Sequence, residues 1–164
     1  MYLRRLKEDD ARFMLEWMHD ISVTGFLKTD FSCKTFEDAY DFIIDSQKDD
    51  NNLNLAISNE NDEYMGTVSL KHINEVNAEF AIVVRRCAMG KGYAKFGMDE
   101  IIKMALFDYN LRYVYWCVNP DNKRAVIFYD KNNYDRIDYS KIHICGNYGQ
   151  KQLKAYYWYK YPSK

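Results

Sequence analysis

The fold is decided by the stretch Val83-Val84-Arg85-Arg86-Cys87-Ala88-Met89-Gly90-Lys91-Gly92-Tyr93-Ala94. It joins a strand-like segment, residues 78–84, to a long helix whose apolar face carries Met98 and Ile101. A glycine loop at such a junction leaves backbone N–H groups free at the positive end of the helix dipole, which favours a phosphate or pyrophosphate ligand. These residues alone leave two alternatives open, an anion site and an ordinary turn.

Two familiar nucleotide-binding loops do not fit this stretch. A P-loop needs Lys and then Ser or Thr after its last glycine, whereas Gly92 is followed by Tyr93. A Rossmann fingerprint needs a small residue where Lys95 stands, and it opens the first β-α-β unit of its domain. Here the loop follows several strands, so neither site is predicted.

The segments around this junction follow one another in a mixed order. We expect a strand at residues 3–6, a helix at about 9–19 and a second helix with Thr35 as its N-cap. Residues 53–58, 64–71 and 78–84 are typical of strands, and their short connections favour an antiparallel meander. After the long helix we expect a strand at 113–118, a short helix at 124–131 and final strands at 136–144 and 153–159.

Length and composition indicate one globular domain spanning residues 1–164. The 23 Lys and Arg nearly balance the 24 Asp and Glu, so no basic surface indicates nucleic-acid binding. No stretch is apolar enough to cross a membrane and no signal peptide is recognisable, so we expect a cytoplasmic protein. The 4 cysteines are spaced without a metal-binding pattern, and we expect all of them to be reduced and buried.

Two motifs resemble the GNAT superfamily of N-acetyltransferases. Its acyl-CoA motif reads Gln/Arg-x-x-Gly-x-Gly/Ala at a strand-to-helix junction, which this chain fits at Gly92 and Ala94. Further along, the family shows Asn, then Ala or Ser, then Tyr-x-Lys-x-Gly-Phe, and the chain matches at Asn122, Ala125, Tyr129 and Lys131. Met89, Asn133 and Tyr134 replace the usual Gln or Arg, Gly and Phe. Asn is the best substitute for Gly at a positive φ, and Tyr keeps the aromatic ring, so none of these departures removes the chemistry.

The resemblance implies the GNAT fold, an α/β (α+β) arrangement around a mixed, mostly antiparallel sheet of about six to seven strands. Two N-terminal helices, a long CoA-binding helix and a short C-terminal helix belong to it. The strand before the loop would splay from its neighbour, with N–H groups near Val83 and Val84 holding pantetheine and polarising the thioester. The other implied acetyl-CoA contacts are Met89, Gly90, Lys91, Gly92, Tyr93, Ala94, Asn122, Ala125 and Lys131. Asn122 has an alternative role as a turn or cap residue.

The resemblance also implies an acetyl-CoA-dependent N-acetyltransferase that acts by direct transfer. Tyr129 would protonate the CoA sulfur, and packing under the sheet is the alternative for this Tyr. Glu79 would accept the amine's proton directly or through water, and its strand face otherwise carries apolar Ala81 and Val83. A solvated strand carboxylate is the alternative for Glu79. A catalytically degenerate member that binds acyl-CoA as a sensor or interaction module is a further possibility, supported by Met89 and Asn133.

In this family the acceptor lies against the first two helices, their connection and the last strands. The substrate-binding candidates are Trp17, Phe26 and Phe31, with Tyr148 and Trp158 in the same region. Residues 15–20 and 26–29 are similar to the ribosomal-protein-alanine acetyltransferase (RimJ/RimL) branch and its amino-sugar-nucleotide relatives. We expect a small amine or amino sugar as acceptor first and a protein N-terminus next, a monomer or homodimer, and no nucleic-acid, membrane or metal partner.

Overall fold

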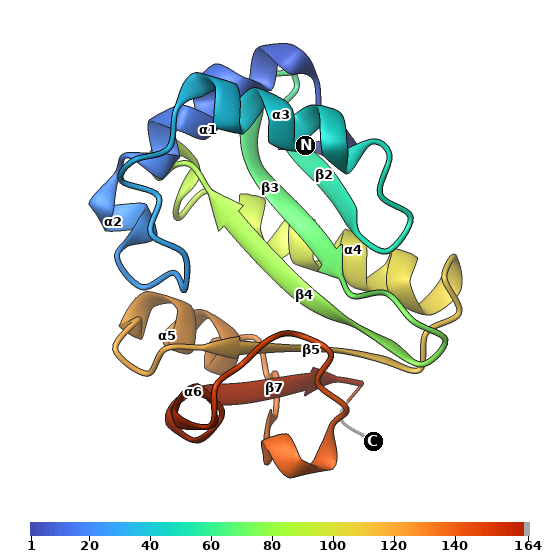
Figure 1. Ribbon diagram of the computed structural model, residues 1–164. Helices are drawn as coiled ribbons and strands as arrows, with labels where there is room; N and C mark the ends of the chain where they lie inside the picture. Colours follow the sequence, from blue (N-terminus) through green and yellow to red (C-terminus); the bar gives the residue numbers. More distant parts are fainter. Residues whose placement is uncertain (163–164) are drawn as a thin grey trace.

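The computed structural model describes residues 1–162, and a seven-stranded sheet of order β1-β2-β3-β4-β5-β7-β6 forms its centre (Figure 1). The strands are β1 (Tyr2–Arg5), β2 (Leu53–Ser58), β3 (Tyr64–Lys71), β4 (Asn77–Val84), β5 (Tyr113–Val118), β6 (Arg136–Ile137) and β7 (Tyr157–Tyr161). Neighbouring strands run antiparallel except β4 and β5, which are parallel. The predicted mixed, mostly antiparallel sheet is confirmed.

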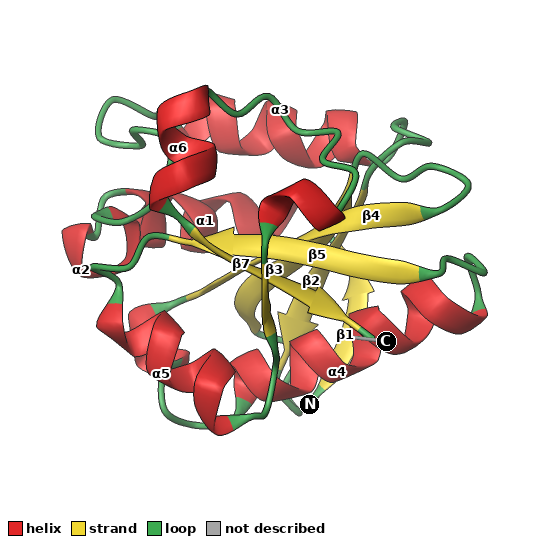
Figure 2. Ribbon diagram, turned by 90° about the horizontal axis from the view of Figure 1, so that it is seen from below, coloured by secondary structure: helices red, strands yellow, loops and turns green. Residues whose placement is uncertain are grey.

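Helices cover both faces of this sheet. Those of the described residues are α1 (Ala11–Met18), α2 (Ile21–Thr24), α3 (Phe36–Ser46), α4 (Tyr93–Phe107), α5 (Lys123–Lys131) and α6 (Gln150–Ala155). Figure 2 shows α1, α3 and α6 on one side of the sheet and α4 and α5 on the other. The two N-terminal helices and the long helix after the glycine loop therefore agree with the prediction, and α2 adds a single turn inside the expected connection.

Alternation along the strands divides the core into layers. Trp116 packs with Phe80 and α4 on one side, whereas its neighbour Tyr115 belongs to a separate cluster with Ile142 and Trp158 on the other. A third cluster joins α1 and α3 to the sheet around fully buried Ile43. A side chain of that size contributes about 1.5–3 kcal/mol when it is fully buried. The two helical layers are thus held by apolar contacts on opposite faces.

The start of α3 follows the predicted capping pattern. The Thr35 hydroxyl accepts the Asp38 N–H at 3.2 Å, and the Asp38 carboxylate accepts the Thr35 N–H at 2.8 Å. This reciprocal capping box satisfies two helix-end donors that would otherwise lack partners. The predicted N-cap is confirmed.

The last part of the chain departs from the prediction. The expected strand at 136–144 is only two residues long, because Asp138 accepts the Ser140 N–H at 2.9 Å and starts a 3-10 turn. The expected strand at 153–159 begins as helix α6, and only its second half enters β7. Short apolar runs fit a helix as well as a strand, so local capping and packing decide between them.

The cysteines and the membrane prediction give two further outcomes. Cys33, Cys87 and Cys145 are exposed and Cys117 is half-buried, so the expectation of four buried thiols is wrong. Cys33 and Cys145 lie in surface connections, and Cys87 lies in the short 3-10 helix Arg86–Ala88 that leads into the glycine loop. Within residues 1–162, no helix is both long enough and apolar enough to span a bilayer.

Candidate active site

The parallel strands β4 and β5 separate halfway along their length (Figure 1). They pair only at Asn77↔Tyr113, Ala78↔Val114 and Glu79↔Tyr115, although β4 runs on to Val84. The rest of β4 therefore keeps one backbone edge unpaired on the β5 side. Unpaired N–H and C=O groups need another partner, and an extended ligand lying along the strand can supply it.

The hydrogen-bond pattern tells which N–H groups face this gap. The Arg85 N–H donates to the Met65 carbonyl of the β3 side at 2.9 Å. Since backbone groups alternate between the two edges of a strand, the N–H of Val83 also points toward β3, where its register partner is Thr67. The N–H of Val84 points into the gap. Of the two expected residues, Val84 thus has the open donor and Val83 does not.

The glycine loop turns the chain from β4 into α4. Gly90 and Gly92 have φ of 74° and 88°, a region that side chains with a Cβ avoid, and Gly92 is the N-cap of α4. The N–H groups of Tyr93 and Ala94 lie in the first helical turn and have no acceptor within the helix. They sit at the positive end of a helix of 15 residues, which suits a pyrophosphate.

The other residues of the loop are placed as follows. Met89 is extended (φ −63°, ψ 140°), and its sulfur contacts the Arg124 guanidinium of α5. Lys91 is exposed beside the two glycines. The loop therefore contacts α5 through Met89 and exposes the cationic Lys91 on its outer side.

The second motif forms the first and last turns of α5. Asn122 caps the helix, its side-chain oxygen accepting the Ala125 N–H at 3.2 Å. This is the cap role that the sequence left open. Lys131 is exposed at the other end of α5, and Asn133 has a φ of 59°, as expected of a residue that stands in for Gly.

Tyr129 lies inside an aromatic cluster on the α5 side of the sheet. Its ring centroid is 5.4 Å from that of Trp116 and 5.0 Å from that of Tyr159, and its residue is 7% exposed. Burial raises the pKa of Tyr129, with smaller contributions from neighbouring Tyr and Cys groups, and no hydrogen bond takes part. The phenol therefore keeps its proton at neutral pH.

Glu79 lies where the two strands separate and is 9% exposed. The Tyr148 hydroxyl donates to its Oε1. Its Oε2 lies so close to Gly146 that a Cβ there would stand 2.6 Å away, which only a glycine permits without a shift. The carboxylate is thus covered by the segment from Cys145 to Gly149.

Tyr148 connects Glu79 to groups that the sequence did not single out. The Cys117 thiol lies 3.6 Å from its hydroxyl oxygen, and the Lys28 ammonium lies 4.3 Å from its ring centroid. Lys28 also donates to the Asn147 carbonyl. Burial, and then the Cys117 and Glu79 groups, raise the pKa of Tyr148. In the sequence, only the prediction that Tyr148 lies in the acceptor region indicated this cluster. Lys28 is far from Tyr148 along the chain, so no local sequence pattern connects the two residues.

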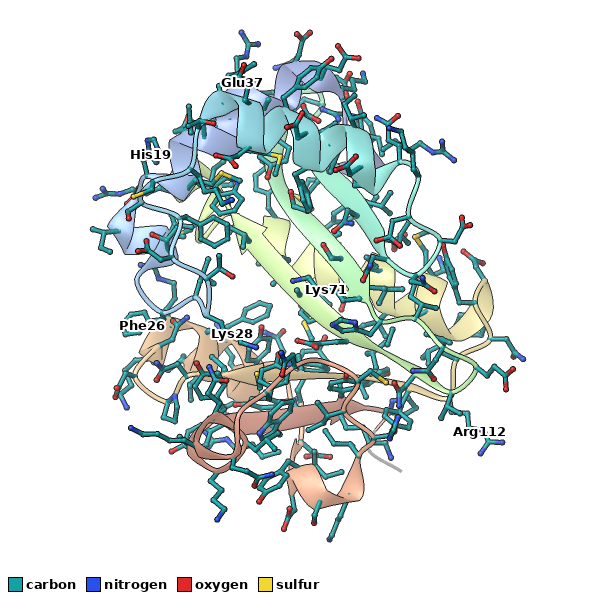
Figure 3. All side chains as sticks on the ribbon, viewed as in Figure 1. His19, Phe26, Lys28, Glu37, Lys71 and Arg112 are labelled. Atoms are coloured by element: carbon teal, nitrogen blue, oxygen red, sulfur yellow. The ribbon has the colours of Figure 1, made fainter. Side chains whose placement is uncertain are left out.

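The three candidate acceptor residues have different surroundings. Trp17 is 4% exposed, its indole N–H donates to the Tyr64 hydroxyl at 3.0 Å, and its ring packs against Phe31 at 5.2 Å. Trp17 is therefore a buried residue that packs against Phe31, and its contact with the acceptor stays a prediction. Phe31 is half-buried, and Phe26 is exposed beside Lys28 (Figure 3).

Arg85 holds the end of β4 against α1. Its guanidinium donates to Glu16 and to Glu63 at 2.7 Å each and to the Tyr64 carbonyl at 2.9 Å. It also lies 4.3 Å from the Phe13 ring centroid. The strand that leads into the glycine loop is thereby fixed to the first helix.

A parallel strand pair that separates, followed by a glycine turn at a long helix, is the arrangement that the GNAT resemblance implies for an acyl-CoA-dependent transferase. Residues 1–134 match the family described as Acetyltransferase (GNAT) domain, and the chain belongs to this family. The protein is an N-acetyltransferase with acetyl-CoA as its co-substrate. Within residues 1–162, no three His, Cys, Asp or Glu side chains gather as metal ligands would.

Relatives and solved structures agree with this assignment. Acetyltransferase PseH of Campylobacter jejuni subsp. jejuni is 22% identical over 142 residues, 85% of this chain and 87% of the relative. A spermidine N-acetyltransferase from Vibrio cholerae, solved in complex with CoA and spermine, has a TM-score of 0.76 at 19% identity. That alignment covers 97% of this chain and 92% of the other. A chimera of this SpeG enzyme and hSSAT gives a TM-score of 0.74 at 20% identity, covering 97% and 93%.

Proposed function

We propose that the protein transfers the acetyl group directly from acetyl-CoA to the primary amine of a small molecule, with Glu79 as base and Tyr129 as acid. The observation that carries the proposal is the position of Glu79, a covered carboxylate at the point where β4 and β5 separate. The thioester would lie along the open edge of β4, so its carbonyl and the amine would meet next to this carboxylate.

Acetyl transfer would then proceed in two steps. The neutral amine attacks the thioester carbon, Glu79 takes the amine's proton directly or through water, and the Val84 N–H stabilises the oxyanion. The tetrahedral intermediate collapses by breaking the C–S bond, and the Tyr129 hydroxyl gives its proton to the departing thiolate. Tyr148 positions Glu79 through its hydrogen bond.

CoA binding would use the glycine loop and the first turns of two helices. The N–H groups of Gly92, Tyr93 and Ala94 would receive the pyrophosphate, with Gly90, Lys91 and Met89 around it. Val84 would hold the pantetheine, and Val83 would contribute its side chain only. Ala125, next to the cap residue Asn122, and Lys131 would contact CoA from α5.

The acceptor is proposed to be a small amine or an amino sugar, with a protein N-terminus as the next candidate. The similar spermidine N-acetyltransferase from Vibrio cholerae was solved in complex with spermine, which supports small amines as a class. The resemblance of residues 15–20 and 26–29 to the RimJ/RimL branch stays a prediction.

Calorimetric titration with acetyl-CoA, with ATP as comparator, is the first test. We expect micromolar binding of acetyl-CoA alone, followed by CoA release when a panel of amines is added. Glu79→Gln should lower kcat by about 10²-fold or more, whereas Glu75→Gln in an exposed loop should leave kcat unchanged. Binding without CoA release would favour the sensor alternative, and no binding by folded protein would reject the function.

A further inference from the structure

Lys71 stands directly opposite Glu79 on the face of the sheet that would receive the acceptor. The two residues are register partners across β3 and β4, so their side chains leave the sheet on the same side. Figure 3, in which α4 lies behind the sheet, shows Lys71 in front of it. Lys71 is exposed, and the carboxylate of Glu79 is held by Tyr148.

A second ammonium group reaches the same place from another segment. Lys28, from the connection between α2 and α3, contacts the Asn147 carbonyl and the ring of Tyr148, the residue bonded to Glu79. Burial raises the pKa of the Cys117 thiol to about 12, and both Lys28 and Lys71 oppose this effect, so both lie within electrostatic reach of that thiol.

Two ammonium groups and the Glu79 carboxylate thus lie near the expected acceptor amine, and Lys71 also lines a surface hollow with Asp45 and Asp49. The ion pairs within 4.0 Å among residues 1–162 include neither Lys28 nor Lys71. Glu79 is committed to Tyr148 and, under the proposed function, to the acceptor amine. Two cations that form no ion pair within 4.0 Å among residues 1–162 therefore remain near it.

We propose that the acceptor amine carries an anionic group, a phosphate or a carboxylate, that Lys71 and Lys28 bind while the amine lies at Glu79. The inference rests on the proposed function and narrows its substrate class. An ammonium group gives a charge-assisted contact to either anion, and a polyamine would bring further positive charge to two lysines. The same cations favour the neutral form of a bound amine, because like charges disfavour its protonation. Binding and reactivity thus point to the same class of acceptor.

Matched probes with and without the anion test this proposal on enzyme saturated with CoA. Glucosamine 6-phosphate against glucosamine, and glycine against glycinamide, differ in the charge and keep the amine. Calorimetry should give about tenfold tighter binding for at least one charged member, and spermidine should bind weakest. The first pair tests for a preference for a phosphate group, and the second pair tests for a preference for a carboxylate group. Raised ionic strength should reduce the preference.

The lysine variants decide where the preference arises. Lys71→Met and Lys28→Met should each remove most of it without changing acetyl-CoA affinity, whereas Lys103→Met, exposed on α4 behind the sheet, should keep it. The proposal is wrong if neither probe with an anionic group binds more tightly than the matched probe without it. It is also wrong if the preference for the anionic probe survives in both variants. If the unmodified protein does not bind acetyl-CoA, the transferase function itself is rejected. The two failures are therefore distinguishable.

Discussion

Replacing Tyr129 by Phe removes the proposed catalytic hydroxyl and keeps the ring that packs in the core. The ring would keep its contacts with Trp116 and Tyr159, at centroid distances of 5.4 and 5.0 Å. No hydrogen bond contributes to the raised pKa of Tyr129, so the hydroxyl supports no partner in the fold. We therefore expect the free energy of unfolding to change by less than about 1 kcal/mol. Acetyl-CoA affinity should likewise stay close to that of the unmodified protein.

The same hydroxyl should matter in the transition state. Loss of a general acid lowers kcat by roughly 10²-fold or more, which corresponds to about 2.7 kcal/mol of barrier. Burial raises the pKa of Tyr129, so its protonated form persists to higher pH than that of an ordinary Tyr. The unmodified enzyme should accordingly show no loss of kcat from this group below about pH 10.

Steady-state kinetics of CoA release, with thermal unfolding measured in parallel, provides the assay. Tyr134→Phe is the matched control, because Tyr134 belongs to the same cluster and its hydroxyl donates only to Asp99, at 3.4 Å. That variant should keep its kcat. An unchanged kcat in Tyr129→Phe, or an equal fall in both variants, would refute the acid role.

Three further predictions concern the loop, the thiols and the buried arginine. Gly92→Ala forces a Cβ onto a φ of 88°, so we expect about 1–2 kcal/mol lower stability and weaker acetyl-CoA binding, while Gly149→Ala at a φ of −68° should change neither. Calorimetry and thermal melts compare the two. Iodoacetamide at neutral pH should label the three exposed cysteines well before Cys117, because a pKa raised to about 12 leaves almost no thiolate, and comparable labelling of all four in a mass spectrum would contradict this. Arg85→Met should cost about 1–3 kcal/mol, since it leaves two carboxylates and a carbonyl without their donor. Lys95→Met, which breaks a surface pair on α4, should stay within about 0.5 kcal/mol in the same denaturant titration.

The predictable part of the fold consisted of segments with long, regular patterns. Residues 53–58 and 64–71 are strand-length runs bounded by polar turn residues, and Thr35 with Asp38 forms a local cap that needs no tertiary partner. The strand predictions for the C-terminal segments were wrong because these segments lack such long, regular patterns. Residues 136–144 and 153–159 are short apolar runs, and Asp138 and Gly149 set turns whose packing partners lie elsewhere in the chain.

The sequence by itself determined the family and the loop that would hold the co-substrate, because both depend on residues close together along the chain. Gly90 and Gly92 lack a Cβ and therefore tolerate the positive φ that both adopt where the chain turns from β4 into α4. Tertiary structure alone decided the surroundings of Glu79. Tyr148, Lys28 and Lys71 come from three distant segments, and a contact between distant segments depends on how the sheet and helices pack. The same packing moved Trp17 into the core, since burial is a property of the folded surface and not of the residue.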